Sequence, residues 1–184
     1  MKSENDMKEG LVLRTIVILV VILLAAAVRI LPHPWNFTPV GAMALFSGAL
    51  VRDRRLAFLI PLLALFAGDL FIGFHKLMPV VYASFLVNVA IGLWLKRGRT
   101  VARIGGATFL GAFQFFVVTN LAVWTWGTTY PHTAAGLTAC YVAAVPFFWN
   151  TLAGDALYAA LLFGGLALAE RLFPALREPA LKGA

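Results

Sequence analysis

The lysine and arginine residues of this chain fall into four clusters, and this distribution constrains the fold more than any other feature. Of the fifteen basic residues, only Arg29 and Lys76 lie outside the clusters, and long apolar stretches separate one cluster from the next. The members are Lys2, Lys8 and Arg14; Arg52, Arg54 and Arg55; Lys96, Arg97, Arg99 and Arg103; and Arg171, Arg177 and Lys182. Cytoplasmic flanks of membrane spans retain Lys and Arg, whereas translocated loops lack them. The pattern therefore predicts a polytopic membrane protein with an even number of spans and both termini in the cytoplasm.

Composition supports a membrane protein and excludes other classes. The chain is 61% hydrophobic and 12% charged, whereas a soluble domain is roughly half apolar and a quarter charged. The net charge of +7 does not indicate nucleic-acid binding, because the basic residues flank apolar stretches and so face the anionic inner leaflet. The single cysteine, Cys140, excludes an internal disulfide. We expect a cytoplasmic tail over 1–10, one membrane domain over 11–172 and a second cytoplasmic tail over 173–184.

Six apolar stretches predict the membrane helices: 11–30, 38–51, 56–74, 78–95, 104–126 and 146–172. A helix of about 20 residues crosses the hydrocarbon core of about 30 Å, a length that most of these stretches reach. The second stretch is shorter, and we expect Thr38 to cap it with Pro39 in its first turn. An alternative interpretation of the first stretch is a signal peptide cleaved after Ala25–Ala27, which would leave the orientation downstream unchanged.

A further short apolar stretch, 134–145, precedes the last predicted span. If it crossed the membrane, the basic C-terminus would lie outside, against the distribution of charge. It is therefore predicted to be a re-entrant or interfacial helix, which is tolerated when protein buries it. The expected fold class is an all-α bundle of about six transmembrane helices with this extra helix before the last one.

Two carboxylates, Asp69 and Asp155, fall within predicted spans. An ionisable group inside a membrane costs several kcal/mol, so it usually faces a cavity or a partner and marks function by default. The structural alternative is that each aspartate caps a loop backbone or pairs with Arg29. Arg29 would then act as one partner of a structural ion pair or as a gate. The sequences around the two aspartates, 66–70 and 152–156, also resemble each other, as internal repeats of transporters do.

Other polar and aromatic groups gather at the predicted outer side. Each of these residues also has a structural interpretation. Amide side chains commonly form hydrogen bonds that hold membrane helices together, and most Trp and Tyr residues near the surface anchor a protein at the membrane–water interface. Convergent polar groups among apolar walls are typical of a small-molecule pocket. The predicted substrate-binding residues are Trp35, Asn36, Asp69, Asn88, Asn120, Trp124, Tyr130, Asn150 and Asp155. His33, His75 and His132 are weak metal candidates, because imidazole suits Co, Ni and Zn but their spacing forms no local motif.

The overall pattern resembles the substrate-binding membrane subunit of energy-coupling-factor vitamin transporters. The motifs Pro-Trp-Asn-Phe-Thr-Pro at 34–39, Ala-Gly-Asp at 67–69 and Asn-Thr-Leu-Ala-Gly-Asp at 150–155 also resemble an uncharacterised bacterial family of putative transport proteins. The resemblance implies capture of a solute near the outer face and a transmembrane partner coupled to an ATPase. The small-residue face that docks on that partner lies on the first helix of such subunits, but here it lies at Gly41, Ala44 and Gly48. No Walker motif is present, so the chain itself does not hydrolyse ATP.

These observations lead to one main hypothesis and three alternatives. The main hypothesis is a multi-pass protein of a bacterial inner membrane, not an enzyme and without a cofactor, that binds a small vitamin-like solute from outside beneath the loops 32–37 and 127–133. A structural scaffold in an envelope complex and a Co or Ni uptake subunit are alternatives. The third is an intramembrane aspartyl protease in which Asp69 and Asp155 share one proton.

Overall fold

The structure is a computed structural model that describes residues 4–29, 31–32 and 34–177. It confirms the predicted all-α class, and no strand occurs in this part of the chain. The described α-helices are α1 (Glu4–Val28), α2 (Val40–Leu50), α3 (Arg54–Ile72), α4 (Met78–Leu95), α5 (Val101–Trp126) and α6 (Ala134–Leu172), followed by the short 3-10 helix η1 (Pro174–Leu176). Helix α1 begins within the predicted N-terminal tail, and the ends of both predicted tails lie outside the described residues.

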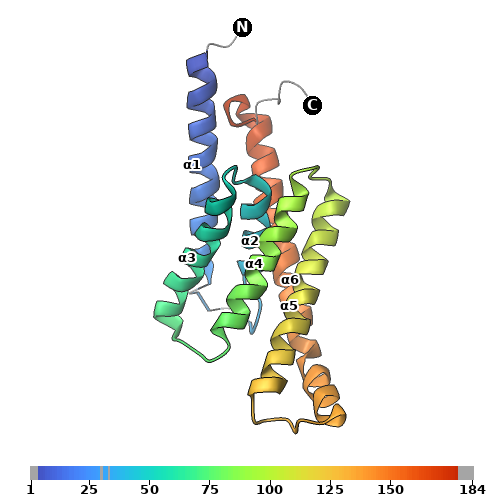
Figure 1. The fold of residues 1–184 in the computed structure, drawn as a ribbon. Coiled ribbons are helices and arrows are strands. Elements are labelled where there is room, and N and C mark those ends of the chain that lie inside the picture. Colours follow the sequence, from blue (N-terminus) through green and yellow to red (C-terminus); the bar gives the residue numbers. More distant parts are fainter. Residues whose placement is uncertain (1–3, 30, 33, 178–184) are drawn as a thin grey trace.

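Successive helices run in opposite directions, so that α1 begins and α6 ends at the same end of the bundle (Figure 1). The α2–α3 and α4–α5 connections lie towards this end, which we call the basic end because its connections hold Arg52, Lys96, Arg97 and Arg99. Five helices are long and apolar enough to cross a membrane, and α2 is a shorter apolar helix. The protein is therefore a multi-pass membrane protein whose helices contact the lipid bilayer.

Helix α2 lies at the centre of the bundle and packs against all five other α-helices. All eleven of its residues are buried, and at ~1.5 Å per residue it is about 16 Å long, roughly half the thickness of the hydrocarbon core. It packs most closely on α4: a Cβ on Gly48 would overlap the carbonyl oxygen of Val89, and a Cβ on Gly92 that of Leu45. Small residues permit this approach of two backbones in membranes. The small-residue face of α2 thus packs inside the bundle.

The prediction of a separate re-entrant or interfacial helix over 134–145 is wrong. These residues and the last predicted span form one continuous helix, α6, of 39 residues with Pro146 inside it. Thr133 caps the start of α6 by accepting a hydrogen bond from Gly136 N at 3.1 Å, and Tyr141 Oη donates to Val117 O of α5 at 2.7 Å. At ~1.5 Å per residue α6 is about 58 Å long, far more than one crossing needs. A single long helix therefore returns the chain to the basic end, with no second element.

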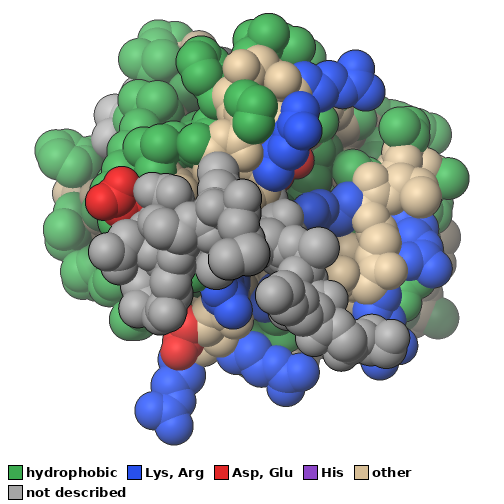
Figure 2. Space-filling view, turned by 90° about the horizontal axis from the view of Figure 1, so that it is seen from above, with side chains coloured by type: hydrophobic (Ala, Val, Ile, Leu, Met, Phe, Trp, Pro, Cys, Tyr) green, Lys and Arg blue, Asp and Glu red, His purple; other side chains and the backbone are tan. Residues whose placement is uncertain are grey.

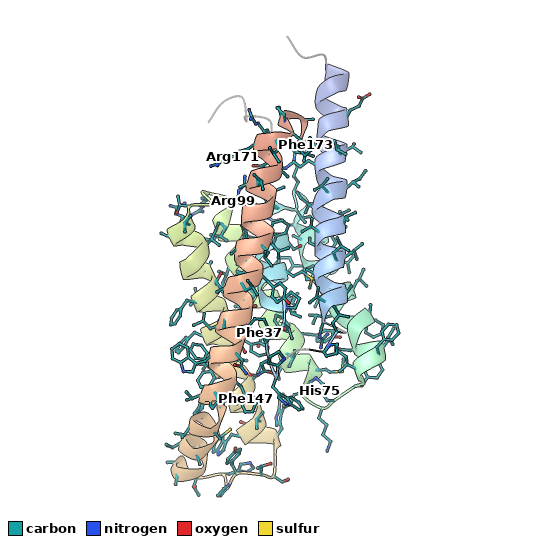
Figure 3. The ribbon with its side chains drawn as sticks, turned by 180° about the vertical axis from the view of Figure 1, so that it is seen from behind. Phe37, His75, Arg99, Phe147, Arg171 and Phe173 are labelled. Atoms are coloured by element: carbon teal, nitrogen blue, oxygen red, sulfur yellow. The ribbon has the colours of Figure 1, made fainter. Side chains whose placement is uncertain are left out.

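The first and last helices are joined at the basic end by a buried arginine. Arg14 of α1 forms an ion pair with Glu170 of α6 and donates a hydrogen bond to Leu176 O of η1 at 2.6 Å. Figure 3 shows Arg99, Arg171 and Phe173 towards this end, and His75 and Phe147 towards the opposite one. The two ends of the bundle therefore differ in chemistry as the sequence predicted: the basic connections lie at one end and the described histidine- and tryptophan-bearing connections at the other.

Candidate functional site

A buried carboxylate near the end of α3 contacts a charged and a polar side chain from other parts of the chain. Asp69 is 1% exposed, and Arg29, the residue after α1, places Nη2 2.6 Å from its Oδ1. Tyr82 of α4 donates a hydrogen bond from Oη to Asp69 Oδ2 at 2.6 Å. Arg29 Nη1 also donates to Leu65 O at 3.2 Å and would lie only 3.2 Å from a Cβ on Gly68. We call Asp69, Arg29 and Tyr82 the Asp69 centre, because three helices meet there on one carboxylate.

The sequence predicted part of this centre. The sequence named Arg29 as a possible partner of Asp69, and the structure shows this ion pair. Tyr82 was missed, although the hairpin offered a signal: α3 and α4 are antiparallel around His75, and Asp69 and Tyr82 lie at nearly equal distances from this turn. Residues so placed on neighbouring antiparallel helices face the same level of a bundle.

The second intramembrane carboxylate caps a helix. Asp155 of α6 is 3% exposed and accepts a hydrogen bond at Oδ1 from Ala42 N, in the first turn of α2, at 3.0 Å. Free N–H groups and a partial positive charge at a helix start favour a carboxylate there. Gly41 is required at this contact, because a Cβ on it would overlap the Asp155 carboxylate.

The start of α2 therefore differs from the expectation. The residue before the helix is Pro39 rather than Thr38, and Pro39 makes no side-chain capping hydrogen bond. A carboxylate from α6, 113 residues away in sequence, replaces the local cap. Sequence alone identified the helix start to within two residues but could not identify this distant partner.

The segment before α2 is attached to α6. Asn150 Nδ2 donates to Trp35 O at 3.0 Å, and the Phe37 ring contacts the Tyr158 ring with centroids 6.2 Å apart. Asn36 has a φ of 61°, a conformation that Asn adopts more readily than most residues. The Trp35 side chain is 81% exposed, so its backbone rather than its ring is held.

The remaining amides form local and interhelical bonds. Asn88 of α4 is buried, and its Oδ1 accepts a hydrogen bond at 2.8 Å from Gln114 Nε2 of α5, which also donates to Ser84 O. Gln114 was not among the predicted site residues, yet it is the partner that satisfies Asn88. Asn120 Nδ2 donates to Phe116 O within its own helix at 2.8 Å. Asn88 thus joins two helices, whereas the hydrogen bond of the Asn120 side chain to a described residue is with the preceding turn of its own helix.

The α5–α6 connection holds the remaining candidates. Trp124 Nε1 donates to Pro131 O at 3.0 Å, and the Trp124 ring meets His132 edge-on with centroids 5.4 Å apart. Tyr130 is half-buried, His75 is exposed, and His33 lies outside the described residues. Among the side chains that the structure describes, no group of three or more His, Cys, Asp or Glu could hold a metal.

The nine predicted substrate-binding residues thus fall into separate sets of contacts. Asp69 belongs to its own centre, while Asp155, Asn150 and Trp35 belong to the attachment of residues 34–42 to α6. Asp69 and Asp155 share no partner among the described residues, unlike a pair of carboxylates that share one proton. The two aspartates that the sequence placed in one site therefore have different hydrogen-bond and ion-pair partners.

A cavity of about 830 Å³ opens at the other end of the bundle, among the basic connections. Its lining includes apolar side chains of α1 and α3, and basic side chains at Arg14, Arg52, Lys96, Arg97 and Arg99. Lys and Arg side chains are prominent on this end, with few acidic ones (Figure 2). None of the nine predicted substrate-binding residues lines this cavity, which we call the basic cavity.

Comparison with known proteins identifies a family without a known activity. The model of one family, described as a family of unknown function (DUF6580), matches residues 10–176. Since the match covers most of the chain, the protein belongs to this family. No curated protein and no solved structure matches the chain. These comparisons do not assign the chain to the energy-coupling-factor subunits.

Proposed function

We propose that this member of a family of unknown function is a transport protein that captures a small, vitamin-like solute from the outer side of a bacterial inner membrane. The observation that supports the proposal is the Asp69 centre, where one buried carboxylate joins α1, α3 and α4. A charged group at such a position usually marks a substrate or ion pathway in membrane proteins. The centre lies towards the end opposite the basic connections, which is the outer end under the positive-inside rule.

The ion pair in this centre is poorly explained by stability alone. Removing two charges from water costs several kcal/mol per ion, and well-packed apolar residues often stabilise a protein as well or better. The pair is also unequally buried: the Arg29 side chain is 15% exposed, whereas that of Asp69 is 2% exposed. A solute could therefore reach Arg29 first and compete with it for the carboxylate.

Such competition suggests how capture would change the shape of the protein. A solute with a positive charge or several hydrogen-bond donors would replace Arg29 at Asp69 Oδ1, while Tyr82 would keep its hydrogen bond to Oδ2 and hold the carboxylate in position. Displacement of Arg29 would release the end of α1 from α3, because this ion pair and the Leu65 carbonyl hold it there. Arg29 would then be a gate as well as a structural ion pair.

Helix α2 provides architectural support. Transporters often place short or interrupted helices at the centre of the bundle, with their ends near the substrate. Here the short helix is wholly buried and its start is occupied by the Asp155 carboxylate. We assign Asp155 a structural role in holding this helix, and Asp69 the recognition role.

The proposal requires an energy source from outside the chain. The sequence contains no Walker motif, so an ATPase-coupled transmembrane partner would drive release, as in the transporters that the sequence resembles. The small-residue face of α2 is buried, so that partner would contact a different surface. No catalytic step and no cofactor are part of the proposal.

A binding screen on the purified full chain tests the proposal. Thermal-shift measurements in detergent would compare cationic, neutral and anionic vitamins, and equilibrium dialysis would then give the Kd of each solute that stabilises the protein. We expect cationic or donor-rich solutes to bind. Loss of a charge-assisted hydrogen bond costs roughly 1.5–3 kcal/mol, so Asp69→Asn should weaken binding about ten- to a hundredfold.

A matched control separates recognition from general damage. Tyr82→Phe removes the hydroxyl that binds Asp69, and Tyr141→Phe removes another interhelical hydroxyl, which donates to Val117 O. We expect only Tyr82→Phe to weaken binding, by about tenfold. If no solute binds, or if Asp69→Asn and Tyr82→Phe bind as tightly as the natural sequence, the proposed function is wrong.

A further inference from the structure

The basic cavity has the dimensions of a ligand site and lies far from the Asp69 centre. Its volume of about 830 Å³ is within the usual range for small-molecule pockets, about 300–1,000 Å³. It lies between α1 and α3, at the level where the α2–α3 and α4–α5 connections meet. Nothing in the proposed transport mechanism uses it, so the following argument is independent of that mechanism.

The walls of the cavity are apolar stripes on two helices. Leu11 and Ile18 on α1 are seven residues apart and Leu56 and Ile60 on α3 are four apart, spacings that place each pair on one helix face. Both stripes begin beside the basic connections and continue along the helices towards the middle of the bundle. This shape suits a hydrocarbon chain lying along the helices rather than a small polar anion alone.

The rim of the cavity is positively charged. Its lining contains five basic residues, of which Arg14 is paired with Glu170, and one acidic residue, Asp53. The Asp53 carboxylate accepts a hydrogen bond from Leu56 N at 3.0 Å and caps α3, which commits it to that helix. Arg52 and Arg97 are exposed at the rim. An anionic group would therefore meet a strongly positive surface here.

The two connections that form the rim are held together before any ligand binds. Lys96, at the end of α4, donates from Nζ to Val51 O at 2.6 Å and to Arg52 O at 3.5 Å. This contact fixes the α2–α3 connection against the α4–α5 connection, so Arg52 and Arg97 come from two elements at one site. Binding to a preassembled site avoids part of the entropic cost of ordering loops.

We propose that the basic cavity binds an anionic phospholipid of the cytoplasmic leaflet. The phosphate of the headgroup lies between Arg52 and Arg97, and one acyl chain lies between α1 and α3. Basic pockets between membrane helices on the cytoplasmic side are suited to anionic headgroups, and the apolar walls below the rim distinguish a lipid from free phosphate.

The experiment uses the full chain in a neutral detergent with three probes: dioctanoyl phosphatidylglycerol, dioctanoyl phosphatidylcholine and inorganic phosphate. Binding is measured by thermal shift and by native mass spectrometry. We expect phosphatidylglycerol to bind and to raise the melting temperature, and the other two probes to do neither. The double variant Arg52→Gln/Arg97→Gln should lose about tenfold or more in affinity for phosphatidylglycerol, since each basic residue near an anionic surface contributes substantially.

Two further variants make the result specific. Arg54→Gln/Arg55→Gln removes the same charge from neighbouring exposed positions that do not line the cavity, and it should retain binding. Ile60→Trp leaves every charge in place but fills the apolar wall, and it should abolish lipid binding while the protein still melts cooperatively in phosphatidylcholine. The proposal fails if phosphatidylcholine or phosphate binds as well as phosphatidylglycerol. It also fails if both double variants lose affinity equally, or if Ile60→Trp binds normally.

Discussion

Asp69 and Asp155 both follow the dipeptide Ala-Gly, yet their side chains meet different partners. The preceding glycines have a common role: a Cβ on Gly68 would lie 3.2 Å from Arg29 Nη1, and one on Gly154 would lie 3.1 Å from Thr38 N. Each glycine therefore leaves room for a neighbouring segment beside the carboxylate. The close packing of a neighbouring segment explains the glycine in both motifs. The role of each aspartate depends on which residues that neighbouring segment brings to the carboxylate.

At the residue scale, Asp155→Asn should destabilise the protein. The substitution keeps the volume of the side chain but removes the negative charge at the start of α2. We expect the free energy of unfolding to fall by about 1–3 kcal/mol, as for a charged hydrogen bond in a partly buried helix-end site. Thermal denaturation in detergent measures the effect.

Asp53→Asn is the control for this prediction, because Asp53 caps α3 at an exposed position. Asn is also a good cap, so we expect a change of a few tenths of a kcal/mol at most. If Asp155→Asn melts like the natural sequence, the carboxylate does not hold α2 in the way described here.

The sequence predicted residue contacts only where charge left few choices. Arg29 is one of two basic residues outside the clusters, so it was an obvious partner for Asp69. Tyr82 and Gln114 were not predicted as partners, because tyrosine and glutamine have many possible roles in a membrane helix. The Asp155 contact with α2 depends on how α6 packs, which no local pattern contains.

At the scale of elements, α2 and α6 differ from ordinary membrane spans in opposite ways. The short length of α2 followed from the sequence, because few apolar residues lie between residue 38 and the cluster at Arg52. The continuity of α6 did not follow from it. Pro146 and the charge distribution both favoured a break in the helix. A single helix much longer than the membrane thickness also returns the basic C-terminal region to the predicted side, so no break is needed.

The contact between α2 and α4 yields a prediction about packing. Gly48→Ala would place a methyl group against the Val89 carbonyl, where the backbones leave no space. We expect a loss of about 1–3 kcal/mol, typical of overpacking a tight core, measured as a lower melting temperature in detergent.

The matched control is Gly165→Ala in α6, where a Cβ would have no neighbour within 4 Å. Alanine favours helix more than glycine does, so this variant should be neutral or more stable. Equal stability of the two variants would show that α2 and α4 are not in the close contact described.

At the scale of the whole molecule, the distribution of charge predicted the most. It predicted the all-α bundle, and it predicted that the start of the first helix, the end of the last helix and the basic connections lie at one end, as the structure shows for α1 and α6 (Figure 1). It did not predict the basic cavity, because the cavity arises where two connections and two helices meet. Nor did it predict that the two aspartates have different partners, since depth in a membrane does not specify which side chains pack nearby.

Both proposals depend on which end of the bundle faces the cytoplasm. Solute capture requires the Asp69 centre on the outer side, and lipid binding requires the basic cavity on the inner side. The chain allows a direct test, because its one cysteine, Cys140, is buried and can be replaced by serine to give a background without thiols. Single cysteines can then be introduced at exposed positions of opposite ends, as His75→Cys and Arg54→Cys.

Labelling of these two variants with a membrane-impermeant maleimide in intact cells measures the orientation. We predict that His75→Cys reacts at once and that Arg54→Cys reacts only after the membrane is permeabilised. Reaction of Arg54→Cys in intact cells, with protection of His75→Cys, would contradict the orientation and both proposals with it.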